Sequence, residues 1–168
     1  KLDKTYYSKN SFNNKYGVPL SIINSPQSTK FSVLEVGMDK KGEIDTLTKL
    51  IRPNLGLITN ISYAHIKNFK NLDEIAKAKG EIINNICPSG VMIINKDDKY
   101  CNYFISKAKM RNLNIITFSK KNKLADVVYL GERKNRNKFL CKFSIKGKIK
   151  FLLIPDYLID FKENILST

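Results

Sequence analysis

Short apolar runs alternate with longer segments of helical periodicity between residues 30 and 119, and this alternation constrains the fold more than any other feature. The predicted strands are 30–36, 55–61, 90–95 and 114–119. The predicted helices are 42–51, 72–86 and 98–112. Strands separated by helices are joined by right-handed crossovers, so this region predicts a parallel sheet covered on both faces.

The pattern changes near Ala125, where three strand-like runs follow one another without helices: 126–131, 138–145 and 148–154. The last two are separated by Lys146-Gly147, a pair typical of a tight hairpin turn. The sequence therefore predicts the α/β class, with a mostly parallel, doubly wound core over residues 11–124 and an antiparallel β extension over 125–155. Its 168 residues correspond to about one domain.

The net charge is +15, from 30 basic and 15 acidic residues, and such a surplus is typical of proteins that bind nucleic acid or anionic surfaces. Most of it lies in residues 95–150, which hold 16 basic and 4 acidic side chains. Only 4 of the 30 basic residues are Arg, whereas proteins that contact phosphates and base edges favour Arg. We interpret the excess as surface lysine from A/T-rich coding, and keep a basic nucleic-acid-binding module as the alternative function.

Cysteines and apolar runs bear on the cellular location. Cys87, Cys101 and Cys141 are widely spaced and odd in number, which fits neither a disulfide framework nor a metal-ligand pattern. The longest apolar runs have four or five residues, too few to cross a bilayer, and no signal peptide pattern opens the sequence. We expect a cytoplasmic protein with no membrane partner.

Polar residues follow three of the predicted strands, at the end where open parallel sheets bind ligands. Glu35 ends the first strand, Asn60 and the single histidine, His65, follow the second, and Asp97 and Asp98 follow the third. Each also has a structural explanation. A lone histidine commonly makes a structural hydrogen bond, and either aspartate could cap the helix that begins there.

Lys79 is the most unusual of the candidate residues, because it interrupts the apolar face of the predicted helix 72–86. The other four positions on that face are Ile75, Ile82, Ile83 and Ile86. The lysine either extends its ammonium group to the rim, or burial favours its neutral form, which can act as a nucleophile or be covalently modified. Periodicity leaves both explanations open.

Six motifs occur in a fixed order along the chain: SFNNKYGVPL from Ser11, EVGM from Glu35 with Gly42-Glu43-Ile44, Arg52-Pro53, TNI from Thr59 with AHI from Ala64, IAKAKGEI from Ile75, and NKDD from Asn95. Together they closely resemble the central domain of the Mur ligase family, over residues 11–119. Beyond Ala125, only the strand pattern and a final Asn164-Ile165-Leu166 continue the resemblance.

The resemblance implies an ATP- and magnesium-dependent amide-bond ligase of peptidoglycan synthesis, in which ATP phosphorylates a substrate carboxylate and an amine attacks the acyl phosphate. The chain is most similar to the members that add D-alanyl-D-alanine to UDP-N-acetylmuramoyl-tripeptide. A sister Mur ligase or a folylpolyglutamate synthase is the alternative within the same class. The full-length enzyme is expected to be a monomer that binds neither nucleic acid nor membrane.

The resemblance also implies roles for particular residues. Glu35 and His65 match magnesium ligands of the family, and Lys79 matches a lysine that is carbamylated by carbon dioxide and helps to hold a second magnesium ion. The segment with Asn13 and Asn14 matches the part that lines the muramyl-peptide substrate. The expected ATP contacts are Asn60 and Asn164.

Several family features are missing from this sequence. Gly37 to Gly42 superficially match the start of a phosphate loop, but Glu43-Ile44 stands where Lys-Ser/Thr is required. The Gly-x-His that should precede Asn164 is not kept either. Because the phosphate loop and the N- and C-terminal domains are absent, we expect an internal piece of a longer ligase that binds ATP poorly and is inactive alone.

Overall fold

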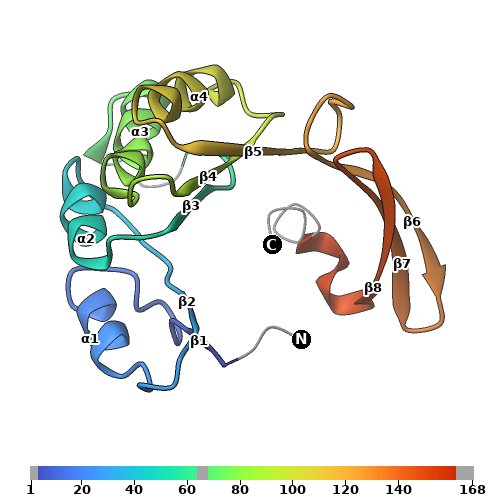
Figure 1. The fold of residues 1–168 in the computed structure, drawn as a ribbon, viewed down its shortest axis with the longest axis horizontal. Helices are drawn as coiled ribbons and strands as arrows, with labels where there is room; N and C mark the ends of the chain where they lie inside the picture. The colour runs from blue at the N-terminus through green and yellow to red at the C-terminus, as the bar shows by residue number, and fades with distance from the viewer. Residues whose placement is uncertain (1–3, 64–67, 162–168) are drawn as a thin grey trace. The chain divides into compact units, whose positions relative to one another are not determined.

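The computed structural model of the chain describes residues 4–63 and 68–161 (Figure 1). His65 and Asn164, two of the expected site residues, lie outside the described residues. The structure divides into two compact units, which we describe separately. The first comprises Lys1–Pro53 with Ser62–Cys87, and the second comprises Asn54–Ile61 with Pro88–Thr168.

The first unit combines a small parallel sheet with helices. Its elements are β1 (Thr5–Tyr7), α1 (Gly17–Ile23), β2 (Phe31–Val33), α2 (Glu43–Ile51), α3 (Leu72–Lys79) and the 3-10 helix η2 (Gly80–Asn85). Strands β1 and β2 pair in parallel, with Thr5 opposite Phe31. Strand β2 and helix α2 lie within the predicted elements 30–36 and 42–51, but β2 pairs with β1 instead of joining the main sheet. Strand β1 and helix α1 were not predicted.

The predicted helix 72–86 is α-helical only to Lys79 and continues as the 3-10 helix η2. Glycine has low helix propensity, and 3-10 turns are common where α-helices end, so Gly80 explains the change. The segment packs on α2, where Ile44, Leu47 and Thr48 are buried. Asn85 Nδ2 fixes the contact by donating to Asp45 Oδ1 and Thr48 Oγ1, both at 2.9 Å.

The second unit is built on a six-stranded sheet in the order β3-β4-β5-β6-β7-β8 (Figure 1). Strands β3 to β6 pair in parallel, and β6 to β8 pair antiparallel, which confirms the predicted fold class. Its elements are β3 (Leu55–Ile58), β4 (Val91–Asn95), α4 (Cys101–Met110), β5 (Asn114–Ser119), β6 (Val127–Asn135), β7 (Lys138–Ile145), β8 (Lys148–Pro155) and the 3-10 helix η3 (Asp156–Phe161).

The predicted hairpin turn joins β7 to β8. Lys146 and Gly147 both have positive φ, 47° and 79°, as a two-residue type I′ turn requires. The core that supports the extension contains Phe118 of β5, Cys141 and Phe143 of β7, and Ile154 of β8. The antiparallel strands are therefore packed against the end of the parallel sheet by one of their two faces.

Candidate functional site

Glu35 lies just after β2, and its exposed carboxylate is oriented by Asn13. The Asn13 side chain donates from Nδ2 to Glu35 Oε1 at 2.8 Å, and the Gly37 amide donates to the Asn13 carbonyl at 2.7 Å. A Cβ atom at position 37 would lie 3.0 Å from Asn13 Cγ, so this close approach favours glycine. The structure thus brings together two residues that the sequence analysis assigned to metal and substrate.

The loop from Asp39 to Gly42 is held by carboxylates. Glu43 Oε2 accepts from the amides of Asp39 and Lys40 at 2.6 and 3.0 Å, and these hydrogen bonds lower the pKa of Glu43. The amides that a phosphate loop would direct at a phosphate are therefore directed at a carboxylate of the same chain.

Asn14, the second expected substrate residue, lies in the turn before α1. Its Oδ1 accepts from the amides of Tyr16 and Gly17, each at 3.0 Å. Side-chain acceptors of this kind satisfy the donors that a helix leaves at its N-terminus. The side-chain oxygen of Asn14 is therefore engaged in hydrogen bonds within the chain.

Lys79 is half-buried at the junction of α3 and η2. The apolar face predicted around it is confirmed for three of its four isoleucines, since Ile75, Ile83 and Ile86 are each no more than 1% exposed, whereas Ile82 is half-buried. Lys79 and Glu35 belong to the same compact unit, together with Asn13 and Asn14.

Glu81 is a residue that the sequence analysis missed. It is only 7% exposed, and its two carboxylate oxygens accept from the amides of Gly42 at 2.8 Å and Asp45 at 3.1 Å, at the start of α2. One signal for it was available: α2 begins after a glycine, which has no side chain to satisfy the helix donors.

Asn60, the expected ATP contact in the second unit, is exposed after β3. The residues beside it are held by the end of β4. Asn95 Nδ2 donates to the Thr59 carbonyl at 2.8 Å, and Asp98 Oδ2 accepts from the Ile61 amide at 2.7 Å. The backbone on both sides of Asn60 is therefore fixed to the neighbouring strand.

The prediction that Asp97 or Asp98 caps the helix α4 was wrong. The helix begins at Cys101, and its N-cap, Tyr100, makes no side-chain cap. Asp98 accepts from the Ile61 amide with Oδ2 and from the Tyr100 amide, just before the helix, with Oδ1. Asp97 accepts from the Ser119 hydroxyl and from the Lys120 amide. These bonds tie the end of β4 to β3 and β5 and hold the turn that leads into α4.

The Asp97 network predicts loss of stability in acid. Burial by itself would raise the pKa of Asp97, but hydrogen bonds from Ser119, Lys120 and Lys121 outweigh it and lower the pKa. A carboxylate with a lowered folded pKa stabilises the fold above its unfolded pKa of about 4, and this contribution is lost as the pH falls through the folded value. Urea unfolding at several pH values from neutral to acid measures this effect. The free energy of unfolding of Asp97→Asn should fall less steeply toward acid than that of the parent. Equal slopes for the two proteins would contradict this.

No three side chains of His, Cys, Asp or Glu are grouped so that they could hold a metal ion, within residues 4–63 and 68–161. The expected donors Glu35 and Lys79 are described, and the third, His65, is not. The side chain of unmodified lysine offers no oxygen atom to a metal ion. Its carbamate would present oxygen atoms, which magnesium prefers. A helix long and apolar enough to span a membrane is also not found among the described residues.

Comparisons with known proteins agree with this fold. The family model described as Mur ligase middle domain matches residues 1–162, and the chain belongs to this family. It is 38% identical over 112 residues to the UDP-N-acetylmuramoyl-tripeptide–D-alanyl-D-alanine ligase of Borreliella burgdorferi, covering 67% of this chain and 24% of the relative. It is 33% identical over 160 residues to the ligase of the same name from Rickettsia prowazekii, covering 95% of this chain and 35% of the relative.

A solved structure gives the same result. The crystal structure of MurF from Acinetobacter baumannii superposes with a TM-score of 0.84 at 26% identity, over 99% of this chain and 35% of that one. The chain thus spans between about a quarter and a third of the length of these relatives.

Proposed function

We propose that this chain acts as the middle domain of an ATP-dependent ligase that joins D-alanyl-D-alanine to UDP-N-acetylmuramoyl-tripeptide through an acyl phosphate. The observation that carries the proposal is the similarity, at 33% and 38% identity, to two ligases of that name. The pairing of Asn13 with Glu35, and the position of Lys79 in the same unit, supply residues suited to such a reaction.

Glu35, Lys79 and His65 are the residues proposed to hold magnesium. Asn13 orients the Glu35 carboxylate, and Lys79 is half-buried in the same unit. The neutral Nζ attacks carbon dioxide and loses a proton to solvent, which leaves a carbamate with two oxygen donors. The donor set then fits a hard cation. When bound, magnesium offsets the negative charge that accumulates on phosphate oxygens.

Substrate and nucleotide contacts are proposed for four asparagines. Asn13 and Asn14 would line the muramyl-peptide. Because Oδ1 of Asn14 is engaged at the start of α1, its contact would use the amide nitrogen. Asn60 and Asn164 are the proposed ATP contacts. We further propose that the enzyme is a cytoplasmic monomer.

A substrate panel tests the proposed activity on the longest natural polypeptide that contains this chain. With ATP and UDP-N-acetylmuramoyl-tripeptide, phosphate release should depend on D-alanyl-D-alanine, and Glu35→Gln should lower it strongly. A sister ligase would instead use a single amino acid as the amine, and a folylpolyglutamate synthase would use glutamate with a folate. Turnover with either of those, and none with the dipeptide, would contradict the proposal.

A further inference from the structure

The antiparallel strands β6, β7 and β8 have two faces of different character. Residues paired directly across an antiparallel ladder lie on the same face. Phe139, Cys141 and Phe143 of β7 face the core of the unit. The residues between them in sequence therefore form the opposite face, which we call the outward face.

The outward face is unusually apolar. Leu140 pairs with Leu153, and Phe151 and Ile149 follow on β8. Their exposed fractions are 61% for Phe151, 47% for Ile149, 45% for Leu153 and 37% for Leu140. The free face of an antiparallel sheet is ordinarily polar, and an exposed apolar patch of this kind marks an interaction site.

Cations lie beside this apolar patch. Residues 127–155 contain eight basic side chains and one acidic side chain, Glu132, and three of the eight, Lys134, Lys148 and Lys150, lie on the opposite face. Arg133 pairs with Leu140, and Lys142 with Phe151, so both cations lie on the outward face. Glu132 pairs with Cys141 and therefore lies on the other face. The outward face thus combines apolar side chains with positive charge only.

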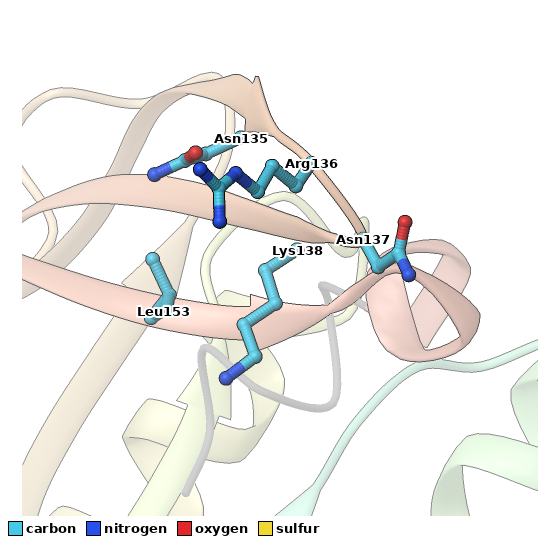
Figure 2. Close-up of a pocket in the computed structure, with 5 residues that line it drawn as sticks. All are labelled: Asn135, Arg136, Asn137, Lys138 and Leu153. Carbon is cyan, nitrogen blue, oxygen red and sulfur yellow. The ribbon is translucent and has the colours of Figure 1, made fainter.

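A shallow pocket continues this face at the turn between β6 and β7. It has a volume of about 600 Å³ and is lined by Asn135, Arg136, Asn137, Lys138 and Leu153 (Figure 2). Figure 2 shows the guanidinium group of Arg136 lying beside the amide of Asn135. A guanidinium fork, an ammonium group and amide donors are the groups that bind phosphate oxygens.

We propose that the outward face of β6, β7 and β8 docks on an anionic phospholipid surface. Phe151, Leu153 and Ile149 enter the boundary between headgroups and acyl chains, the adjacent cations face lipid phosphates, and the pocket with Arg136 and Lys138 receives one phosphate. This combination of apolar and basic side chains is the chemistry of peripheral membrane binding. A nucleic acid would match the cations but would leave the aliphatic patch in contact with the phosphate backbone.

The proposal is independent of the ligase function and departs from the expectation of no membrane partner. That expectation depended on the short apolar runs of the sequence, which exclude crossing a bilayer. Docking needs only a few exposed apolar side chains next to positive charge.

Co-sedimentation with vesicles tests the proposal on the 168-residue chain. Binding is expected to vesicles of phosphatidylcholine with phosphatidylglycerol, to weaken with salt, and to be absent with phosphatidylcholine alone. The double variant Arg136→Glu, Lys138→Glu should bind at least about tenfold more weakly, because each cation near such a surface contributes a factor of about five. Phe151→Ser should also weaken binding, by removing an inserted ring.

Matched controls come from the same unit. Lys109→Glu changes the charge of an exposed residue of α4, and Leu124→Ser removes an apolar side chain that is 84% exposed outside the outward face. Both should keep most of the binding. Equal loss in the controls, or equal binding to neutral vesicles, would overturn the proposal.

Two further results would overturn it. One is tighter binding to duplex DNA than to anionic vesicles, weakened by the same variants, which would make the face a nucleic-acid site. The other is the absence of vesicle binding in the longest natural form of the polypeptide, which would show that another part of that polypeptide covers the face.

Discussion

Lys79→Met is expected to abolish the ligase turnover of the enzyme that carries this domain. Methionine has a long unbranched side chain that can fill a half-buried position, but it cannot form a carbamate. Removal of a group that stabilises charge in the transition state lowers kcat by about 10²–10³-fold. Steady-state phosphate release in the presence of both substrates measures the effect.

Lys77→Met is the matched control, because Lys77 is exposed on the same helix. It should retain turnover close to that of the parent enzyme. The carbamate also has a direct readout: labelled carbon dioxide should give a carbamate resonance in the parent domain that is absent from Lys79→Met. Turnover of Lys79→Met at the parent rate would show that Lys79 only packs in the helix face.

Glu81→Ala is expected to cause the largest loss of stability of any single carboxylate substitution in the first unit. It leaves the amides of Gly42 and Asp45 without their acceptor at a half-buried helix start. Each donor left unsatisfied costs about 1–3 kcal/mol when buried, so the loss of both hydrogen bonds should cost at most about 2–6 kcal/mol. That is a large share of the about 5–15 kcal/mol by which a typical domain is stable.

Urea unfolding measures this loss, and Glu81→Gln keeps the test informative if the alanine variant does not fold. The glutamine oxygen can still accept one of the two amides, so its effect should be intermediate. Asp73→Ala, which removes an exposed carboxylate from the first turn of α3, should cost less than about 1 kcal/mol. Equal losses for Asp73→Ala and Glu81→Ala would contradict the role given to Glu81.

Strong local periodicity made most of the second unit predictable. The run 114–119 is the strand β5, 138–145 is β7, and Lys146-Gly147 forms the predicted turn. Strand β1 has only three residues, too few to show an alternation. The pairing of β2 with β1 was also not predictable, because an apolar run indicates a strand without indicating its partner.

The residues of the candidate site were predictable only where they lie in a motif of the family. The resemblance assigned Asn13 to the substrate and Glu35 to the metal, and the structure joins them by a hydrogen bond. The partner of Glu81 lies 39 residues away, at Gly42, so no local pattern connects the two. Asp97 was misassigned for a similar reason: its partner, Ser119, is 22 residues further along the chain.

Turnover of a chimera tests the central claim most directly. The matched segment of the Borreliella burgdorferi ligase would be replaced by the corresponding segment of this chain, which keeps the remaining three-quarters of that relative. We predict ATP-dependent addition of D-alanyl-D-alanine to UDP-N-acetylmuramoyl-tripeptide by this chimera, and its loss in the same chimera with Lys79→Met. A folded chimera that binds both substrates and forms no product would contradict the account.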